Sequence, residues 1–379
     1  MSKKQAPGRC SPKCRGQCSL AKDVLELKEL VLAQNKRLNK LIKQVEQGCE
    51  VVEEPKESTV SCRNPYLKCL NPDRLHHLGL DTKTTDFRKT FGDVRFVFLG
   101  GTPKRMEKFA YFIMNAIGLR LHSGAKLKDL AEEGNRYSMF KVGPVLCASH
   151  GMGGPSISIL LHELIKMMCH AKCQDPVFFR LGTCGGIGVE PGTVIISTEA
   201  LDGQMRNFHE VVVHGKVDLR PTKLNLELAQ ELKDLSNPCE DGYDTITGTT
   251  LSTNDFYEGQ SRLDGAFCEY TPESKSNFLK CLSQKGIVNM EMESSVFASM
   301  TNQANIRAAV VCVAIVNRLN GDQITTPHET LKEFDTRPQE LVARYVRKIL
   351  YGGDEEEDAD EEEEEEGKDE GKDCPEEVR

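Results

Sequence analysis

Residues 70–351 predict an α/β fold, with a twisted central mixed β-sheet, mostly parallel, flanked by helices. Short apolar runs typical of buried strands alternate along the chain with longer segments of helical periodicity. Alternation of this kind favours a sheet covered by helices. Three of the apolar runs also lead directly into glycine-bearing turns, the usual place of ligands in open α/β sheets.

Each expected element has its own local pattern. The strand candidates are short runs of mainly β-branched, aromatic and other apolar residues, and lie at Val94–Leu99, Val145–Ser149, Val177–Arg180, Val194–Ser197 and Ala308–Val316. The helix candidates repeat apolar residues at spacings of three and four, and lie at Met106–Ile117, Ser156–His170, Leu224–Leu235, Ser274–Lys285, Met292–Asn302 and Gln339–Leu350.

The chain before residue 70 divides into three segments. Residues 1–22 are basic and carry three cysteines without a fourth ligand nearby, so we expect a disordered, thiol-bearing segment rather than a closed zinc site. Residues 23–47 predict an amphipathic, coiled-coil-like helix, because apolar residues from Val24 to Val45 follow heptad spacing. That helix could cover its own domain, a second copy or another protein. Residues 48–69 are expected to be a linker.

Residues 352–379 are expected to be a disordered acidic tail. From residue 354 onward there are 17 acidic and three basic side chains, against a net charge of −9 for the whole chain. Like charges at this density repel one another and bury nothing. The acidity of the chain therefore belongs to the tail, and we expect no nucleic-acid partner.

Composition also indicates the cellular compartment of the protein. No run of 18 apolar residues occurs, so no membrane span is expected. The basic N-terminus lacks the apolar region of a secretory signal. The 15 cysteines, an odd number scattered over a large chain, are typical of reduced thiols rather than of a disulfide framework. We therefore expect a cytoplasmic protein.

The three glycine turns predict an anion pocket. They follow the strand candidates that end near Leu99, Ser149 and Arg180. Glycines let the backbone approach an anion, and helix N-termini present free N–H groups. Arg105, Arg180 and Thr183 lie in or beside these turns and are suited to phosphate. The alternative is three ordinary turns with surface arginines.

Several rival sites lack their motifs. The segment from Gly151 to Ser156 resembles a dinucleotide loop, but its last position is serine and the next strand ends at Arg180 rather than at an acidic residue. Neither the Gly-Lys-Ser/Thr of an NTP-binding loop nor the Gly-x-Ser-x-Gly of a hydrolase is present. The nine histidines form no metal signature.

The order and spacing of several motifs across residues 73–350 resemble the nucleoside phosphorylase family, and in particular its animal uridine phosphorylases. Gly100–Arg105 and Arg180–Thr183 look like the two phosphate segments of that family. Phe256–Arg262 resembles its uracil-recognition segment and Glu291–Glu293 its ribose segment. Ile315–Arg318 looks like the wall that completes the pocket in pyrimidine enzymes, where purine enzymes carry an aspartate at the position of Asn317.

The resemblance implies a role for individual residues. The phosphate residues would be Gly101, Arg105, Arg136, Arg180 and Thr183. The substrate-binding residues would be His77, Phe256, Gln260, Arg262, Glu291, Met292, Glu293 and Ile315, with Arg262, Gln260 and Glu293 also catalytic. Arg136 and His77 would reach the site of a neighbouring subunit. Tyr137 stands where bacterial relatives have a cation-binding glutamate, so no metal site is implied.

The implied activity is reversible phosphorolysis of uridine to uracil and ribose 1-phosphate in pyrimidine salvage, with deoxyuridine or thymidine as further substrates. Phosphate would be a co-substrate, and no cofactor is implied. The implied assembly is a homo-oligomer with shared active sites, at least a dimer. Two alternatives stay open: a phosphorylase for another nucleoside, or a nucleoside-binding scaffold that assembles through its terminal extensions.

Overall fold

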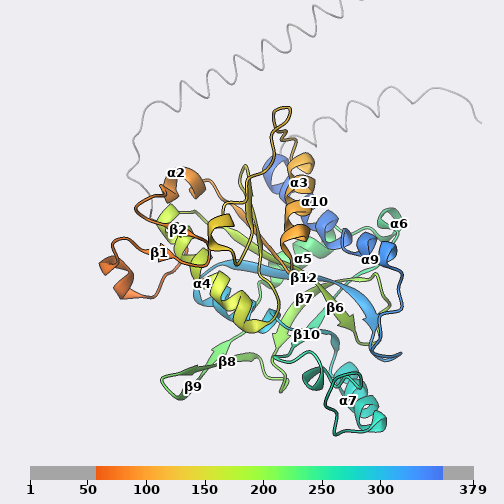
Figure 1. Cartoon of the computed structure of the whole chain (residues 1–379). Coiled ribbons are helices and arrows are strands. Elements are labelled where there is room, and N and C mark those ends of the chain that lie inside the picture. Colours follow the sequence, from red (N-terminus) through yellow and green to blue (C-terminus); the bar gives the residue numbers. More distant parts are fainter. Residues whose placement is uncertain (1–56, 353–379) are drawn as a thin grey trace, which may run out of the picture. The chain divides into compact units, whose positions relative to one another are not determined.

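The computed structural model describes residues 57–352 (Figure 1). The segments 1–22 and 23–47, the first part of the expected linker and the tail from residue 353 lie outside the described residues. Within residues 57–352, no helix has both the length and the apolar character needed to cross a membrane.

The described part is built on one eight-stranded mixed sheet. Its strands lie side by side in the order β11-β10-β7-β12-β6-β3-β5-β4. Their bounds are β3 Phe96–Gly100, β4 Met139–Val142, β5 Val145–Ser149, β6 Val177–Gly186, β7 Val194–Leu201, β10 Thr245–Ser252, β11 Ile287–Glu291 and β12 Arg307–Asn317. Strand β11 pairs with β6 as well as with β10, so the five strands from β11 to β6 close into a ring. The predicted α/β class with a central mixed sheet is confirmed.

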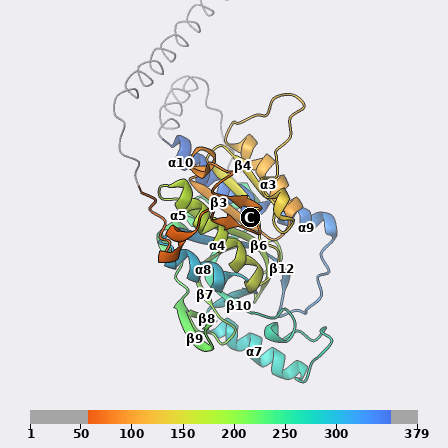
Figure 2. The same cartoon turned by 60° about the vertical axis from the view of Figure 1, so that its left-hand side comes forward.

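Helices cover both faces of this sheet (Figures 1 and 2). The α-helices are α2 Phe87–Phe91, α3 Pro103–Ala116, α4 Gly154–Ala171, α5 Leu226–Asp234, α6 Pro238–Asp241, α7 Pro272–Gln284, α8 Ser294–Gln303, α9 His328–Phe334 and α10 Arg337–Tyr351. Short 3-10 helices are η1 Pro65–Cys69, η2 Glu132–Gly134 and η3 Glu258–Gln260. Two small antiparallel pairs, β1 Arg74–Leu75 with β2 Leu80–Asp81 and β8 Phe208–Val213 with β9 Lys216–Pro221, lie outside the main sheet.

Strand β3 shows how the two layers form. Alternate residues of a strand point to opposite faces of its sheet. Val97 and Leu99 accordingly belong to the buried cluster shared with α2, α4 and α8. Phe96 and Phe98 belong to the cluster shared with α3, α5 and α10. A strand buried on both faces reads as a continuous apolar run, which is why this one could be predicted from the sequence.

The third predicted glycine turn is wrong. Strand β6 does not end at Arg180 but continues to Gly186, paired in parallel with β12 along this length. The glycines of this segment instead leave room for arginine side chains. A Cβ at Gly182 would lie 2.7 Å from the guanidinium of Arg180, and one at Gly185 would lie 2.8 Å from the side chain of Arg318.

The other two glycine turns are present. Strand β3 ends at Gly100 and α3 begins three residues later. Strand β5 ends at Ser149, and the loop before α4 places Gly151 and Gly153 at φ values of 73° and 82°. Only glycine adopts such backbone angles without strain, so this loop requires both residues.

The expected linker contains ordered structure from residue 57 onward. The backbone N–H of Thr59 donates to the carbonyl oxygen of Cys173, and that of Ser61 donates to the carbonyl oxygen of Ala304. Val60 is buried in the core cluster. Residues 57–62 therefore pack against the ends of α4 and α8, whereas the 3-10 helix η1 that follows has no buried residue.

Candidate active site

The candidate site is a cavity of about 460 Å³ between the β3–α3 and β5–α4 loops, strand β6 and the segment after β10. It brings together eleven of the thirteen residues that the sequence analysis assigns to phosphate or substrate. These are Gly101, Arg105, Arg180, Thr183, Phe256, Gln260, Arg262, Glu291, Met292, Glu293 and Ile315. Segments as far apart in the chain as Gly101 and Ile315 thus meet in one cavity, as the resemblance implies.

One end of the cavity carries two guanidinium groups. Arg105 lies in the first turn of α3, whose N-cap Thr102 accepts a hydrogen bond from the Arg105 N–H. Asp335 holds the Arg105 side chain, with both carboxylate oxygens 3.0 Å from Nη2. Arg180 extends from β6 and is only 3% exposed. Two cations beside a helix N-terminus make this end suited to an anion.

Arg180 lies between two acidic side chains. Its Nη2 is 2.9 Å from a carboxylate oxygen of Glu291 and also donates to the carboxylate of Glu293. Glu291 in addition accepts hydrogen bonds from the backbone N–H groups of Glu293 and Ser294, which start α8. The second oxygen of Glu293 accepts from the N–H of Gly153. Buried charges of this kind are tolerated because they are paired and hydrogen-bonded.

The two carboxyl groups differ in their protonation behaviour. Burial raises the pKa of Glu291 and outweighs the opposite effect of Arg180. Burial acts in the same direction on Glu293, but Arg180 and the N–H of Gly153 outweigh it and the pKa of Glu293 is lowered. Glu293 is therefore the carboxylate that stays ionised beside the open cavity. Burial lowers the pKa of Arg180, yet the two glutamates raise it by more, so the guanidinium stays charged.

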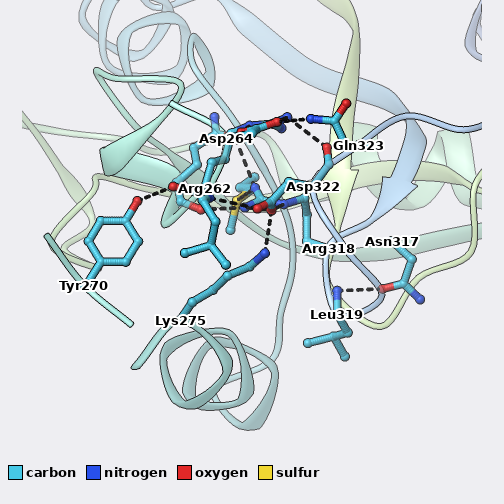
Figure 3. A network of polar contacts seen from close by, with 12 residues as sticks. Arg262, Asp264, Tyr270, Lys275, Asn317, Arg318, Leu319, Asp322 and Gln323 are labelled. Carbon is cyan, nitrogen blue, oxygen red and sulfur yellow. Dashed lines mark hydrogen bonds and ion pairs between the residues drawn. The ribbon is translucent and has the colours of Figure 1, made fainter. Parts of the chain in front are cut away.

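The other end of the cavity presents Arg262 in a fixed orientation (Figure 3). Its Nε and Nη2 donate to the two carboxylate oxygens of Asp264 at 2.9 and 2.8 Å, and Nη2 also donates to the carbonyl oxygen of Asp322. The ring of Phe256 lies against the guanidinium, 4.4 Å from its central carbon. Nη1 is the group left to meet a ligand.

A second arginine lies behind this wall. Arg318 is 1% exposed and pairs with the carboxylate of Asp322 through Nε and Nη2 (Figure 3). Its Nη2 also donates to the carbonyl oxygen of Gln260 at 2.7 Å. Lys275 from α7 contacts the same Asp322 carboxylate at 2.7 Å. The network fixes the loop that carries Gln260 and Arg262.

Gln260 itself is buried. Its Nε2 donates to the hydroxyl of Thr253 at 3.3 Å. Ile315 and Ile324 supply apolar surface to the same cavity, and Phe256 is 39% exposed at its rim. An amide and a guanidinium set among apolar groups can read the polar edge of a planar heterocycle.

Two predicted residues do not line the cavity of their own chain. Arg136 is exposed and lies at a separate hollow with Asp129 and Glu132. His77 is half-buried, and its Nδ1 lies 2.7 Å from the carboxylate of Glu163, which also accepts the His77 backbone N–H. With Nδ1 occupied, Nε2 is the nitrogen available to a ligand.

The structure adds residues that sequence reasoning missed. His150 and Ile324 line the cavity, and Asp264 and Asp322 hold its arginines. The sequence also did not predict strands β4, β10 and β11. Of these, β11 contributes Met290 and Glu291 to the wall of the cavity. Asp264 lies only two positions after Arg262 in the sequence. That spacing alone does not reveal that its carboxylate accepts two hydrogen bonds from the guanidinium.

Asn317 does not line the cavity. Its side-chain oxygen accepts from the backbone N–H of Leu319 (Figure 3) and from that of Gly188. Its amide donates to Glu190. Of the segment expected to complete the pocket, Ile315, Val316 and Arg318 do face it. Asn317 instead fixes the end of β12.

Within residues 57–352, no group of three or more histidine, cysteine or acidic side chains is arranged to hold a metal ion. Tyr137 is buried, and its hydroxyl donates to the carbonyl oxygen of Ser156.

A mixed α/β fold whose cavity combines two arginines, a buried carboxylate and a further guanidinium with an amide is what the resemblance to nucleoside phosphorylases implies. The sequence model of the Phosphorylase superfamily matches residues 95–350, and the chain belongs to that family. It is 45% identical to uridine phosphorylase 1 of Mus musculus over 291 residues, which cover 77% of this chain and 93% of that protein.

Two relatives from Schistosoma mansoni are informative. A crystal structure of its uridine phosphorylase in complex with thymidine matches with a TM-score of 0.73 and 38% identity, and covers 76% of this chain and 98% of that one. A protein named inactive uridine phosphorylase B is 38% identical over 285 residues, which cover 75% of this chain and 95% of that protein. Similarity of this degree therefore extends to a protein named as a uridine phosphorylase and to one named as inactive.

Proposed function

We propose that this chain is a uridine phosphorylase, a pentosyltransferase that cleaves uridine reversibly with inorganic phosphate to give uracil and ribose 1-phosphate in pyrimidine salvage. The observation that carries the proposal is the set of groups gathered in one cavity. Arg105 and Arg180 line it with two cations, Glu293 contacts Arg180, and Gln260 and Arg262 belong to the separate network of Asp264, Arg318 and Asp322. These groups are suited to phosphate, ribose and uracil in turn.

The phosphate end prepares the nucleophile. Arg105 and Arg180, with the Thr183 hydroxyl and the backbone at Gly101, would hold the dianion below C1′ of the ribose. Glu293, kept ionised by Arg180, would accept hydrogen bonds from the ribose hydroxyls. Met292 would lie under the sugar. Fixing both reactants in this way converts a bimolecular step into an effectively unimolecular one.

The base end would stabilise the leaving group. As the C1′–N1 bond breaks, negative charge passes to the uracil ring. Nη1 of Arg262 and the amide of Gln260 are the donors placed to meet that charge at the ring oxygens and N3. Donors fixed in advance at a developing anion typically contribute about 3–4 kcal/mol each. The proton lost by hydrogen phosphate is the one that uracil gains.

The assembly proposed here is a homo-oligomer, at least a dimer, with shared active sites. Arg136 and His77 lie away from the cavity of their own chain, so they can serve phosphate and ribose only from a neighbouring subunit. The β8–β9 ribbon supports the proposal, since it exposes Val212 and Val217, which are 66% and 60% exposed. Apolar side chains gathered on one ribbon are typical of a surface that is covered by a partner.

Location and cofactor use are proposed on the same basis. Ten cysteines in the described part of the chain are free, as expected of a protein in the reducing cytoplasm. Phosphate acts as co-substrate, and each step above is assigned to side chains of this chain without a cofactor.

A second candidate function is uridine binding without turnover, as in a scaffold protein, because one relative is named as inactive. A panel of nucleosides distinguishes the enzyme from the binding protein. Uridine, deoxyuridine, thymidine, inosine and adenosine are incubated with phosphate, and free base is measured. Base release from the pyrimidine nucleosides alone supports the uridine phosphorylase. A rise in melting temperature with uridine but no release from any nucleoside would support the binding protein.

A further inference from the structure

The imidazole of His150 is the one buried histidine in the described residues whose two ring nitrogens both lack a hydrogen-bond partner. His150 follows β5 directly, is 2% exposed and lines the candidate active site. Buried polar side chains are nearly always hydrogen-bonded, and an unpaired one destabilises the folded chain. An orphan imidazole in a ligand cavity therefore indicates a contact that a ligand completes.

The backbone fixes where this ring lies. The His150 N–H donates to the carbonyl oxygen of Gly100 at 2.8 Å, and its own carbonyl oxygen accepts from the Ser156 hydroxyl at 2.6 Å. Strand β5 pairs with β3 so that Ser149 lies opposite Gly100. His150 is thereby held beside the Gly100–Arg105 turn, at the phosphate end of the cavity and not at the uracil end.

Three charged groups surround the ring. Arg180 of β6, Arg105 of α3 and Glu293 before α8 all act on it electrostatically. Burial, reinforced by Arg180, lowers the pKa of His150 from 6.5 to about 3. The imidazole is therefore neutral at physiological pH and offers one N–H donor and one acceptor nitrogen. The Nε of Arg180 is a second buried donor without a partner in this cavity.

We propose that His150 is a further phosphate-binding residue, whose ring N–H donates to an oxygen of the phosphate held by Arg105 and Arg180. The inference rests on the proposed function, because it assumes that phosphate occupies this end. Phosphate fits the surroundings better than a ribose hydroxyl does. Two cationic side chains and two donors without a partner favour an anion that has several acceptor oxygens. Glu293 is already placed to accept hydrogen bonds from the ribose hydroxyls.

The test compares phosphate binding by the wild type with that by His150→Phe and His150→Ala, which remove the donor. His150→Asn and His150→Gln place an amide N–H near the position of Nδ1 or Nε2. His122→Phe, on an exposed loop outside the cavity, is the matched control. Each variant is checked for folding by its melting temperature. Phosphate Kd is titrated calorimetrically, and KM is measured for phosphate and uridine separately.

A hydrogen bond to a charged group contributes about 1.5–3 kcal/mol, so we expect the Kd and KM for phosphate to rise about tenfold or more in His150→Phe and His150→Ala. The KM for uridine should change less than twofold, and one amide variant should recover most of the phosphate affinity. Unchanged phosphate affinity in either donor-free variant that folds would overturn the proposal. So would a loss confined to uridine. If the wild type itself binds no phosphate, the proposed function fails, and not only the role of His150.

Discussion

Asp264 accepts two parallel hydrogen bonds from Arg262, at 2.9 Å from Nε and 2.8 Å from Nη2. This pairing fixes the plane of the guanidinium, since two parallel hydrogen bonds hold the Nε–Nη2 edge of the arginine and the carboxylate together. It explains why a flexible side chain on a loop can present Nη1 to the same point of the cavity. The specificity of the base end thus depends on a residue that does not line it.

The first prediction concerns Asp264→Ala. Without its carboxylate, Arg262 loses its fixed orientation, and we expect the KM for uridine to rise about tenfold while the KM for phosphate stays within twofold. Steady-state kinetics with each substrate varied in turn provides the measurement. Glu231→Gln, which removes a carboxylate paired with Arg307 on the surface, is the control and should leave both constants unchanged. Equal loss for both substrates would mean that Asp264 only supports the fold.

The second prediction separates the two buried glutamates. Glu293→Gln removes the carboxylate beside the proposed ribose position, so kcat should fall about a hundredfold, and the lost pair with Arg180 should lower the free energy of unfolding as well. Glu291→Gln weakens the cap of α8 and the pair with Arg180, so its main effect should be on the free energy of unfolding, by about 1–3 kcal/mol. Kinetics and urea unfolding of both variants decide the matter. A Glu293→Gln enzyme with wild-type kcat would remove Glu293 from the mechanism.

The third prediction uses the lowered pKa of His150, from 6.5 to about 3. Between these values the unfolded chain binds a proton at this residue that the folded chain does not bind. Stability is therefore lost as the pH falls below 6.5, and His150→Gln should not show that loss. From pH 7 to pH 5, the free energy of unfolding should fall by about 2 kcal/mol more in the wild type than in the variant. Parallel pH curves would show that His150 is not buried in its neutral form.

The fourth prediction tests the shared site. Arg136→Ala and Arg180→Ala should each be nearly inactive as homo-oligomers. In a mixed dimer one site combines the intact Arg180 of one subunit with the intact Arg136 of its partner. Co-expression of the two chains should therefore restore about a quarter of wild-type activity, because half of the dimers are mixed and half of their sites are whole. If both arginines act within one chain, the mixture stays as inactive as its parents.

How far the sequence predicts this fold depends on the kind of strand. The candidates at 145–149 and 94–99 match β5 and β3 closely, because strands buried on both faces are continuous apolar runs. Strand β10 was missed because the polar threonines and Gly248 of Thr245–Ser252 interrupt the apolar run that marks a buried strand. The register of such a strand is set by its neighbours β7 and β11, which no local pattern reveals.

The candidate site could be predicted where the chemistry is carried by motifs. Eleven of the thirteen residues assigned by resemblance gather in one cavity, and Arg136 and His77 do not. The supporting groups could not be assigned in this way. Asp335 lies 230 positions from Arg105, and Asp322 lies 60 from Arg262, so only the folded chain brings them together. The continuation of β6 through Gly186 was hidden for a similar reason, since its glycines make room for arginine side chains.

The most direct test of the central claim is the release of uracil from uridine by the purified full-length chain, measured with and without inorganic phosphate. We expect release only with phosphate, an equal amount of ribose 1-phosphate, and at least a hundredfold loss of rate in Arg180→Ala. Uracil release that does not depend on phosphate, with free ribose as the other product, would contradict the assignment of Arg105 and Arg180 to a phosphate nucleophile.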